Sequence, residues 1–134
     1  MIRVMLDTNI LISAIVFESK PMLEIIQRLA DKYSMVLCSY VIDELREVID
    51  EKFPHKKEAT ERFLLKVPFE LVYAPQALPD DFAFAVRDED DEIILYSAML
   101  SDVDILVTGD KDLLAVEDVE RPEILSHLEF LKKY

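Results

Sequence analysis

The amino-acid sequence predicts an α/β fold with a largely parallel sheet and helices on both of its faces. Short apolar runs typical of buried strands alternate with longer amphipathic stretches typical of helices, and no repeat or low-complexity linker interrupts them. Hydrophobic residues make up 51% of the 134 residues and charged residues 32%, a balance typical of an ordered globular protein. We therefore expect one domain that spans residues 1–134.

The first elements are expected to be a strand and two helices. Residues 2–6 are apolar except for Arg3, which indicates a buried strand, and a helix is expected over residues 9–17. Ser19 and Pro21 are typical of a helix start, so a second helix is expected to reach about residue 32. The buried face of this second helix is expected to contain Met22, Leu23, Ile25, Ile26 and Leu29.

The middle of the chain continues the alternation. Residues 35–38 predict a second strand, after which Ser39 is expected to cap a helix that ends near residue 53. Pro54 is expected to begin another amphipathic helix, and residues 69–73 predict a third strand. The segment 75–86 contains two prolines and two aspartates and gives no clear pattern. The remaining expected elements are a helix at 88–101, a strand at 104–107, an edge strand at 123–125 and a closing helix at 126–133.

Composition excludes several classes of protein. Gly109 is the only glycine, so the chain has neither the phosphate-binding GxxxxGK[ST] loop nor the GxGxxG dinucleotide turn, which both need several glycines. The single cysteine, Cys38, excludes an internal disulfide and is expected to be a buried thiol. The apolar run at 2–6 is too short to span a bilayer and lacks the pattern of a signal peptide. We therefore expect a cytoplasmic protein that does not associate with a membrane.

Four acidic residues fall where the ends of parallel strands would bring them together. Asp7 follows the first expected strand, and Asp110 follows the strand at 104–107. Glu44 and Asp91 belong to two of the expected helices. Ligands and substrates bind at the carboxyl ends of such strands, so one crevice is expected to receive all four carboxylates.

A cluster of carboxylates requires a cation, because close carboxylates oppose one another's ionisation. Oxygen ligands without a histidine and cysteine cluster favour Mg²⁺ or Mn²⁺ over zinc. Such ions bind phosphates, activate water and stabilise the leaving oxygen, which together suit hydrolysis of a phosphodiester. A cation would also offset the formal net charge of −13, which otherwise disfavours binding to nucleic acid.

Each acid also has a purely structural interpretation. Asp7 is a suitable helix cap, Glu44 is a suitable solvated helix residue, and Asp110 is a suitable turn residue after Gly109. The acidic run at 88–92 is of the kind that complements the N-terminus of a helix. None of these residues is specific evidence by itself.

Taken together, the acidic segments resemble the PIN-domain family, and in particular its small prokaryotic members that act as toxins of toxin–antitoxin modules. The resemblance extends over almost the whole chain. The segments that carry it are Leu6-Asp7-Thr8-Asn9-Ile10-Leu11, Asp43-Glu44-Leu45, Arg87-Asp88-Glu89-Asp90-Asp91 leading to Ala98, and Val107-Thr108-Gly109-Asp110-Lys111-Asp112-Leu113-Leu114.

The resemblance implies a three-layer α/β/α sandwich, cleavage of single-stranded RNA that depends on Mg²⁺ or Mn²⁺, a homodimer and an antitoxin protein as partner. The four family acids, which are both catalytic and metal-binding, correspond to Asp7, Glu44, Asp91 and Asp110. Polar residues that support the metal correspond to Thr8, Asn9 and Thr108. Asp88 and Asp90 are rivals of Asp91 for the third position, and Asp112 is a candidate to share the fourth.

Other functions stay open at this point. A non-catalytic PIN-like module that binds RNA or protein would suit the acidic charge. A phosphotransferase with Asp7 as nucleophile, as in the haloacid dehalogenase superfamily, would need an aspartate where Asn9 stands. A DNA-directed PIN-like nuclease is a third alternative. Candidates for contacts with substrate phosphates are Arg46, Lys56, Lys57, Arg87 and Lys111.

Overall fold

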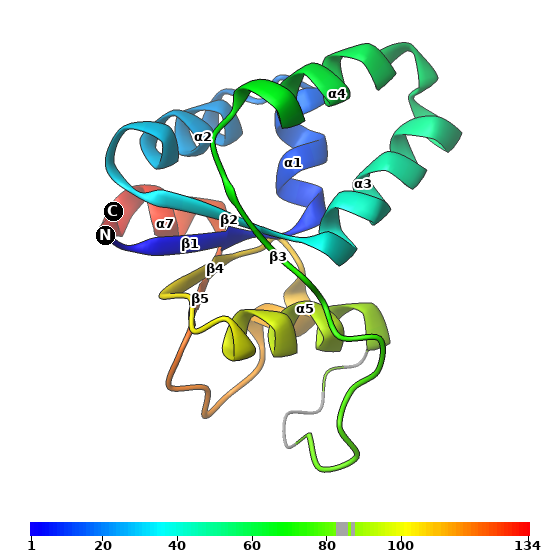
Figure 1. The fold of residues 1–134 in the computed structure, drawn as a ribbon. Helices are drawn as coiled ribbons and strands as arrows, with labels where there is room; N and C mark the ends of the chain where they lie inside the picture. Colours follow the sequence, from blue (N-terminus) through cyan, green and yellow to red (C-terminus); the bar gives the residue numbers. More distant parts are fainter. Residues whose placement is uncertain (83–85, 87) are drawn as a thin grey trace.

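A computed structural model of the chain describes residues 1–82, 86 and 88–134 (Figure 1). The described strands are β1 (Arg3–Leu6), β2 (Ser34–Cys38), β3 (Glu70–Val72), β4 (Ile105–Val107) and β5 (Glu123–Leu125). The described helices are α1 (Thr8–Ile15), α2 (Lys20–Lys32), α3 (Ser39–Lys52), the 3₁₀ helix η1 (Pro54–Lys56), α4 (Lys57–Lys66), α5 (Glu89–Leu100), α6 (Lys111–Leu114) and α7 (His127–Lys133).

The described strands form one parallel sheet in the order β3-β2-β1-β4-β5. Figure 1 shows α1 to α4 on one side of the sheet and α5 on the other, while α7 packs beside α2 and β5. The predicted α/β/α layers are therefore confirmed. Helix α1, which follows β1, and helix α6, which follows β4 and contacts α5, leave the paired ends of these two strands toward opposite faces of the sheet. Such a point in a parallel sheet forms the type of crevice that binds ligands.

The core explains why the central strands are continuous apolar runs. Helices cover both faces of β1, β2 and β4, so Val4, Met5, Leu6, Leu37 and Leu106 are all completely buried. Helix α3 presents Val41, Leu45 and Ile49 to this core at helical spacing. Burial of this kind fixes the register of the strands, because a slip of one residue would expose their apolar side chains.

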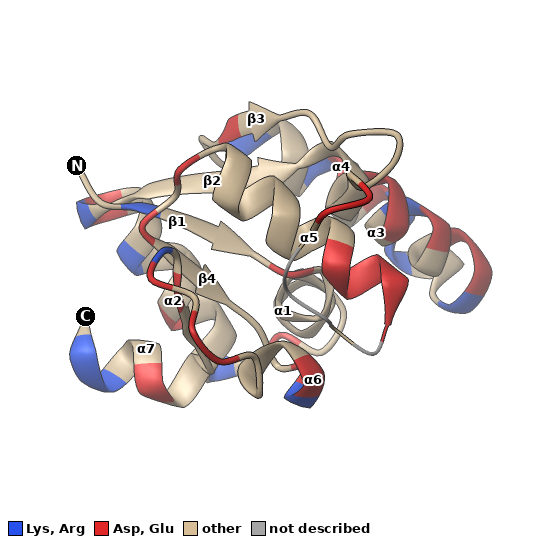
Figure 2. Ribbon diagram, turned by 90° about the horizontal axis from the view of Figure 1, so that it is seen from below, with Lys and Arg blue, Asp and Glu red and all other residues tan. Residues whose placement is uncertain are grey.

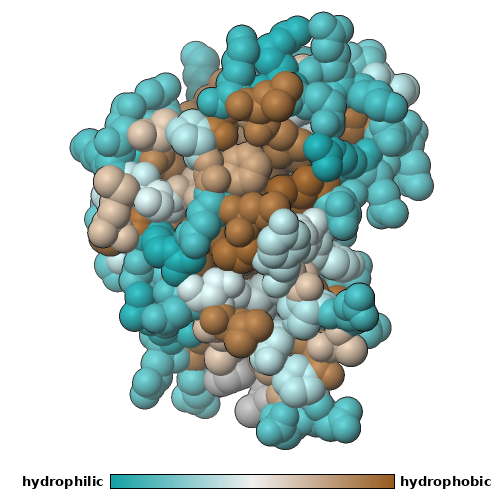
Figure 3. Space-filling model, viewed as in Figure 1, coloured by the Kyte–Doolittle hydropathy of each residue, from teal (hydrophilic) through white to brown (hydrophobic). Residues whose placement is uncertain are grey.

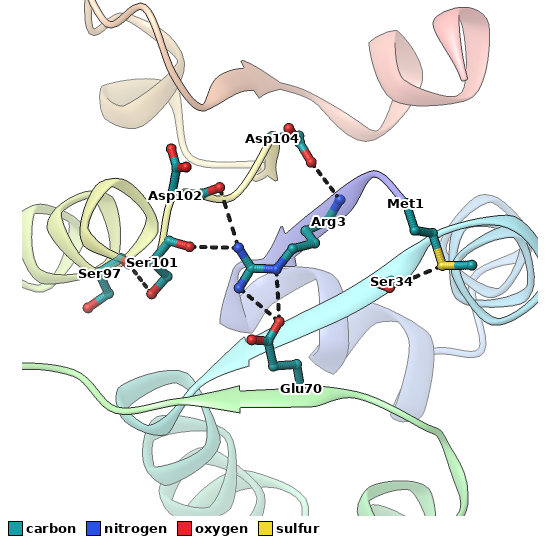
Figure 4. Close-up of polar contacts among 8 residues, drawn as sticks. All are labelled: Met1, Arg3, Ser34, Glu70, Ser97, Ser101, Asp102 and Asp104. Carbon is teal, nitrogen blue, oxygen red and sulfur yellow. Dashed lines mark hydrogen bonds and ion pairs between the residues drawn. The ribbon is translucent and has the colours of Figure 1, made fainter.

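Arg3 links the amino ends of strands of the sheet (Figure 4). Its guanidinium group donates to Glu70 over 2.9 Å and to the carbonyl oxygen of Ser101 over 2.6 Å, and its backbone N–H donates to Asp104 over 2.8 Å. These contacts join β1 to β3 and to the segment that leads into β4. Polar contacts of Arg3 thus join the strands at their amino ends, away from the carboxyl ends where the acidic residues were predicted to gather.

Several local predictions need correction. Helix α6 was not predicted, since it has only four residues. Neither Ser19 nor Ser39 makes a capping hydrogen bond, and the Ser39 hydroxyl instead accepts the backbone N–H of Ala74 over 2.9 Å. Leu23 is 44% exposed rather than buried, because it lies at the edge of the apolar face of α2. The predicted third strand is shortened to Glu70–Val72.

Apolar side chains gather on the face of the molecule that Figure 3 shows. A groove of about 680 Å³ lies between α3, α4 and β3, and its lining includes Leu65, Leu71 and the 79% exposed Tyr73. None of the four predicted acids contributes to it. Among the described residues, no helix is both long and apolar enough to cross a membrane.

Candidate active site

Asp7 lies immediately beyond β1, and two groups fix its carboxylate. The backbone N–H of Thr8 donates to one oxygen over 2.6 Å, which makes Asp7 the N-cap of α1. The hydroxyl of Thr108, beyond the neighbouring strand β4, donates to the other oxygen over 2.6 Å. Asp7 is only 4% exposed and Thr108 is completely buried. The capping interpretation of Asp7 is therefore correct, and it is compatible with a place in a site.

Thr108 also connects Asp7 to Asp110. The Thr108 hydroxyl oxygen accepts the backbone N–H of Asp110 over 3.0 Å, so one side chain contacts both acidic positions. The Asp110 carboxylate in turn accepts the backbone N–H of Asp112 over 2.7 Å and that of Leu113 over 3.4 Å, and so caps α6. This hydrogen-bonded turn brings Asp110 to the same end of the sheet as Asp7.

The first turn of α5 presents three aspartates with different environments. Asp88 is exposed and caps the helix by accepting the backbone N–H of Asp90 over 2.9 Å. Asp90 is also exposed and accepts a hydrogen bond from the hydroxyl of Tyr40 on α3. Asp91 is only 6% exposed, and its Oδ2 atom has no hydrogen-bond partner among the described residues. Asp91 is thus the one that turns into the protein.

The four predicted acids line one cavity of about 160 Å³. Asp7 reaches it from the end of β1, Glu44 from α3, Asp91 from α5 and Asp110 from the end of β4. Figure 2 shows the acidic positions concentrated at the first turn of α5 and along α3 and α6. The second-tier residues that also line the cavity are Thr8, Asn9, Asp88 and Asp90. Thr108 lies beneath it, in contact with Asp7 and Asp110.

Burial and mutual repulsion both oppose ionisation of these acids. Burial raises the pKa of Asp7, although hydrogen bonds from Thr108 and Thr8 counteract part of this effect. Burial likewise raises the pKa of Glu44, a hydrogen bond from Thr8 counteracts part of this effect, and the negative charge of Asp7 adds to it. The pKa of Asp91 is raised to about 8, first by burial and then by the adjacent Asp110. The free protein therefore holds protons that a cation would displace.

The residues present fit a divalent cation of the Mg²⁺ or Mn²⁺ type. One carboxylate oxygen from each of Asp91, Asp110 and Asp112 lies within 4.8 Å of the others. The buried Oδ2 of Asp91 lacks a hydrogen-bond partner within the described part of the chain, while the buried Thr8 hydroxyl interacts with the Glu44 carboxylate. The free oxygen of Asp91 is a ligand of the kind that hard cations select. Asp112 thus remains a candidate ligand beside Asp110, and Asp7 and Glu44 are not part of this close group of oxygens.

The protein's own cations do not neutralise the cluster in the described part of the chain. No lysine or arginine there forms an ion pair with any of the four acids. Arg46, a candidate for phosphate contact, is paired with Glu61 over 2.9 Å, and Lys57 is paired with Asp50 over 3.4 Å. Arg87 lies outside the described residues.

Sequence reasoning did not select Tyr40 as a residue of the site. Its pKa is raised above the usual range by burial and by the hydrogen bond to Asp90, with the charges of Glu44 and Asp88 adding to the effect. The available signal was its spacing, because Tyr40 precedes Glu44 by four residues on α3 and therefore shares its side of the helix.

A sequence model that describes the PIN domain matches residues 3–112 of this chain. This match covers well over half of the chain and includes all four acids. The chain belongs to the PIN-domain family. Helix α7 and strand β5 lie beyond the matched part of this PIN domain. A search of curated proteins found no significant match.

Solved structures confirm the PIN fold at low sequence identity. A chain of the VapBC2 complex from Rickettsia felis bound to a promoter DNA fragment is 20% identical, with 92% of this chain and 97% of that chain covered and a TM-score of 0.68. A chain of DNA-bound VapBC from Salmonella typhimurium is 16% identical, with 95% and 99% covered and a TM-score of 0.67. A domain of a functionally unknown protein from Methanocaldococcus jannaschii is 19% identical, with 92% and 89% covered and a TM-score of 0.56.

Proposed function

We propose that this PIN-domain chain is a cytoplasmic endoribonuclease that hydrolyses single-stranded RNA and depends on Mg²⁺ or Mn²⁺. The observation that carries the proposal is the cavity lined by Asp7, Glu44, Asp91 and Asp110, in which one buried carboxylate oxygen has no partner within the described residues. Family membership supports the assignment to a toxin-type nuclease.

In this proposal the four acids hold the cation, and Thr8, Asn9 and Thr108 support them. A bound divalent cation supplies Lewis-acid stabilisation of the charge that develops on a phosphodiester and eases deprotonation of water. The chain's part is to keep the ligands in place before the cation arrives. Thr108 does this for Asp7 and Asp110 together, and the helix caps do it for the turns that carry Asp91 and Asp110.

We also propose an antitoxin protein as partner and a homodimeric assembly. The two VapBC structures that share the fold are complexes bound to DNA, which supports a search for a partner of this kind. The test is expression of the chain alone and together with a small protein encoded next to it. We expect growth arrest in the first case and recovery with co-purification in the second. Normal growth with active soluble protein would argue against the toxin assignment.

The decisive experiment is cleavage of a labelled single-stranded RNA by metal-free protein to which Mg²⁺ or Mn²⁺ is returned. Cleavage should require the ion and stop in EDTA. Asp7→Asn should lower the cleavage rate by orders of magnitude, whereas Asp80→Asn, an exposed acid outside the cavity, should leave it unchanged. Undiminished cleavage after exhaustive chelation would overturn the metal-dependent mechanism.

The alternative is a non-catalytic PIN module that binds RNA or protein, and the net charge of −13 is the observation that favours it. The same experiment separates the two functions. A chain that takes up Mn²⁺ but leaves a range of RNA substrates intact would support the binding module, and cleavage that Asp7→Asn abolishes would exclude it.

A further inference from the structure

Tyr40 connects the two helices that carry Glu44 and Asp91. It lies in the first turn of α3, one turn before Glu44. Its hydroxyl donates to Oδ1 of Asp90, the residue that directly precedes Asp91 in the first turn of α5. The hydrogen bond therefore spans the edge of the acidic cavity and joins one side of the candidate metal centre to the other.

This contact has a distinctive place in the fold. Figure 1 shows α3 and α5 on opposite sides of the sheet, so their first turns approach each other only where both pass the carboxyl ends of the strands. Among the described residues, Tyr40 to Asp90 is the only hydrogen bond between these two helices. The separation of Glu44 and Asp91 depends on how these turns are held relative to each other.

Both the ring and the hydroxyl of Tyr40 are suited to holding the first turns of α3 and α5 relative to each other. The ring is partly buried and packs against the hydrophobic core, which anchors it to α3. Its hydroxyl is a neutral donor among carboxylates, so it satisfies one oxygen of Asp90 without adding a cation that would compete with a metal ion. An Asp90 carboxylate held in this way is kept beside the cavity, while Asp91 turns into it.

We propose that Tyr40 is a positioning residue of the candidate metal centre, which uses its hydrogen bond to Asp90 to set the place of Asp91 relative to Glu44. This inference rests on the proposed function and adds a residue to it. It also assigns distinct roles to two neighbouring aspartates, because Asp90 becomes the acceptor of the Tyr40 hydroxyl and Asp91 the metal ligand.

The test is the dissociation constant for Mn²⁺, measured by calorimetry on the metal-free full chain. Tyr40→Phe keeps the ring and removes the hydroxyl, and it should weaken Mn²⁺ binding about 10-fold, as for other groups that orient metal ligands. Tyr73→Phe is the matched control, since Tyr73 is 79% exposed and outside the acidic cavity, and it should bind Mn²⁺ like the parent.

A second pair of variants separates the acceptor role of Asp90 from its charge. Asp90→Asn and Asp90→Ala remove the same charge, but only asparagine keeps an oxygen that can accept from Tyr40. Asp90→Ala should therefore weaken Mn²⁺ binding more than Asp90→Asn does. The double variant Tyr40→Phe with Asp90→Ala should bind Mn²⁺ no more weakly than whichever single variant binds it less tightly. The two changes remove the same hydrogen bond, so their effects should not add.

The outcomes are distinct for the two proposals. Parent-like Mn²⁺ affinity in Tyr40→Phe, or equal loss in Asp90→Asn and Asp90→Ala, would overturn the role of Tyr40 while leaving the nuclease assignment intact. A parent chain that binds no Mn²⁺ would overturn both. If Tyr40→Phe does not fold, the comparison of Asp90→Asn with Asp90→Ala still decides the matter.

Discussion

At the scale of single residues, Asp91 shows how burial and crowding act on the candidate site. Its pKa is raised to about 8, whereas an aspartate in an unfolded chain has a value near 3.8. Between these values the folded metal-free protein binds a proton that the unfolded chain releases. This group therefore stabilises the fold at low pH, and its contribution is lost as the pH rises towards 8.

We accordingly predict that the free energy of unfolding in EDTA decreases between pH 5 and pH 8, by up to about 1.4 kcal/mol per pH unit for this group. Asp91→Asn should make this decrease shallower, because asparagine does not titrate. Saturating Mn²⁺ should reverse the trend in the parent, since the metal displaces protons from its ligands. Urea unfolding at several pH values measures the free energy of unfolding for the parent in EDTA, for Asp91→Asn in EDTA and for the parent in Mn²⁺. Identical pH profiles for parent and Asp91→Asn would contradict the prediction.

Thr108 acts on two acids at once, so its loss should affect both stability and activity. Thr108→Val keeps the shape but leaves Oδ2 of Asp7 without its donor, while the Thr8 N–H still donates to Oδ1, and it leaves the backbone N–H of Asp110 without an acceptor. An unsatisfied buried group costs about 1–3 kcal/mol. We predict destabilisation of this size in EDTA and a lower rate of RNA cleavage in Mn²⁺, whereas Thr108→Ser should retain most of both. A valine variant that matches the parent in stability would refute the shared role of the hydroxyl.

At the scale of elements, continuous apolar runs predicted β1, β2 and β4 well, because strands buried on both faces require such runs. Short elements were harder to predict. The four residues of α6 are too few for a periodic pattern, and the structure forms this helix around the Asp110 cap. Capping by Ser39 was wrong because its hydroxyl is used by the backbone of Ala74, a contact between segments that sequence distance conceals.

Part of the candidate site could be predicted from the positions of the expected strands. Asp7 and Asp110 follow strands, so parallel pairing alone placed them together. The preference for Asp91 over Asp88 and Asp90 came from the family resemblance. The structure gives a physical difference between the three, namely burial, which sequence cannot report. The contact of Tyr40 with Asp90 could not be predicted, since it depends on how closely α3 and α5 approach.

Variants of Asp88 at the start of α5 can show whether this residue caps the helix or binds the metal ion. Asp88 caps this helix, so Asp88→Ala should cost ~1 kcal/mol of stability, while Asp88→Asn should keep the cap and the stability of the parent. If Asp88 serves as a cap alone, Asp88→Asn should also keep Mn²⁺ binding close to that of the parent. Thermal melts in EDTA and in Mn²⁺ measure the two effects separately. A loss of Mn²⁺ binding in Asp88→Asn, with stability unchanged, would instead make Asp88 a ligand.

At the scale of the whole molecule, the negative charge of the chain disfavours binding of the proposed RNA substrate. The chain has 28 acidic against 15 basic residues, and part of this excess surrounds the cavity at the end of the sheet. RNA is also a polyanion, so the free protein and its substrate should repel each other at the site where they must meet. A cation bound by the four acids reverses the field locally, because it is the largest charge in the site.

We therefore predict that affinity for RNA depends on the divalent ion itself and not only on ionic strength. Stopped-flow anisotropy with a labelled single-stranded RNA, recorded before cleavage products accumulate, should detect binding in Mn²⁺ and little or none in EDTA, with KCl added to match ionic strength. In Mn²⁺ the affinity should fall only gently as salt increases, because a contact made through the bound cation neutralises few phosphates and so releases few counterions. Equal affinity with and without Mn²⁺ would mean that RNA is held by basic residues away from the acids, and a steep dependence on salt would point to the same conclusion. In either case the net charge of −13 would no longer argue for a cation as the bridge between protein and substrate.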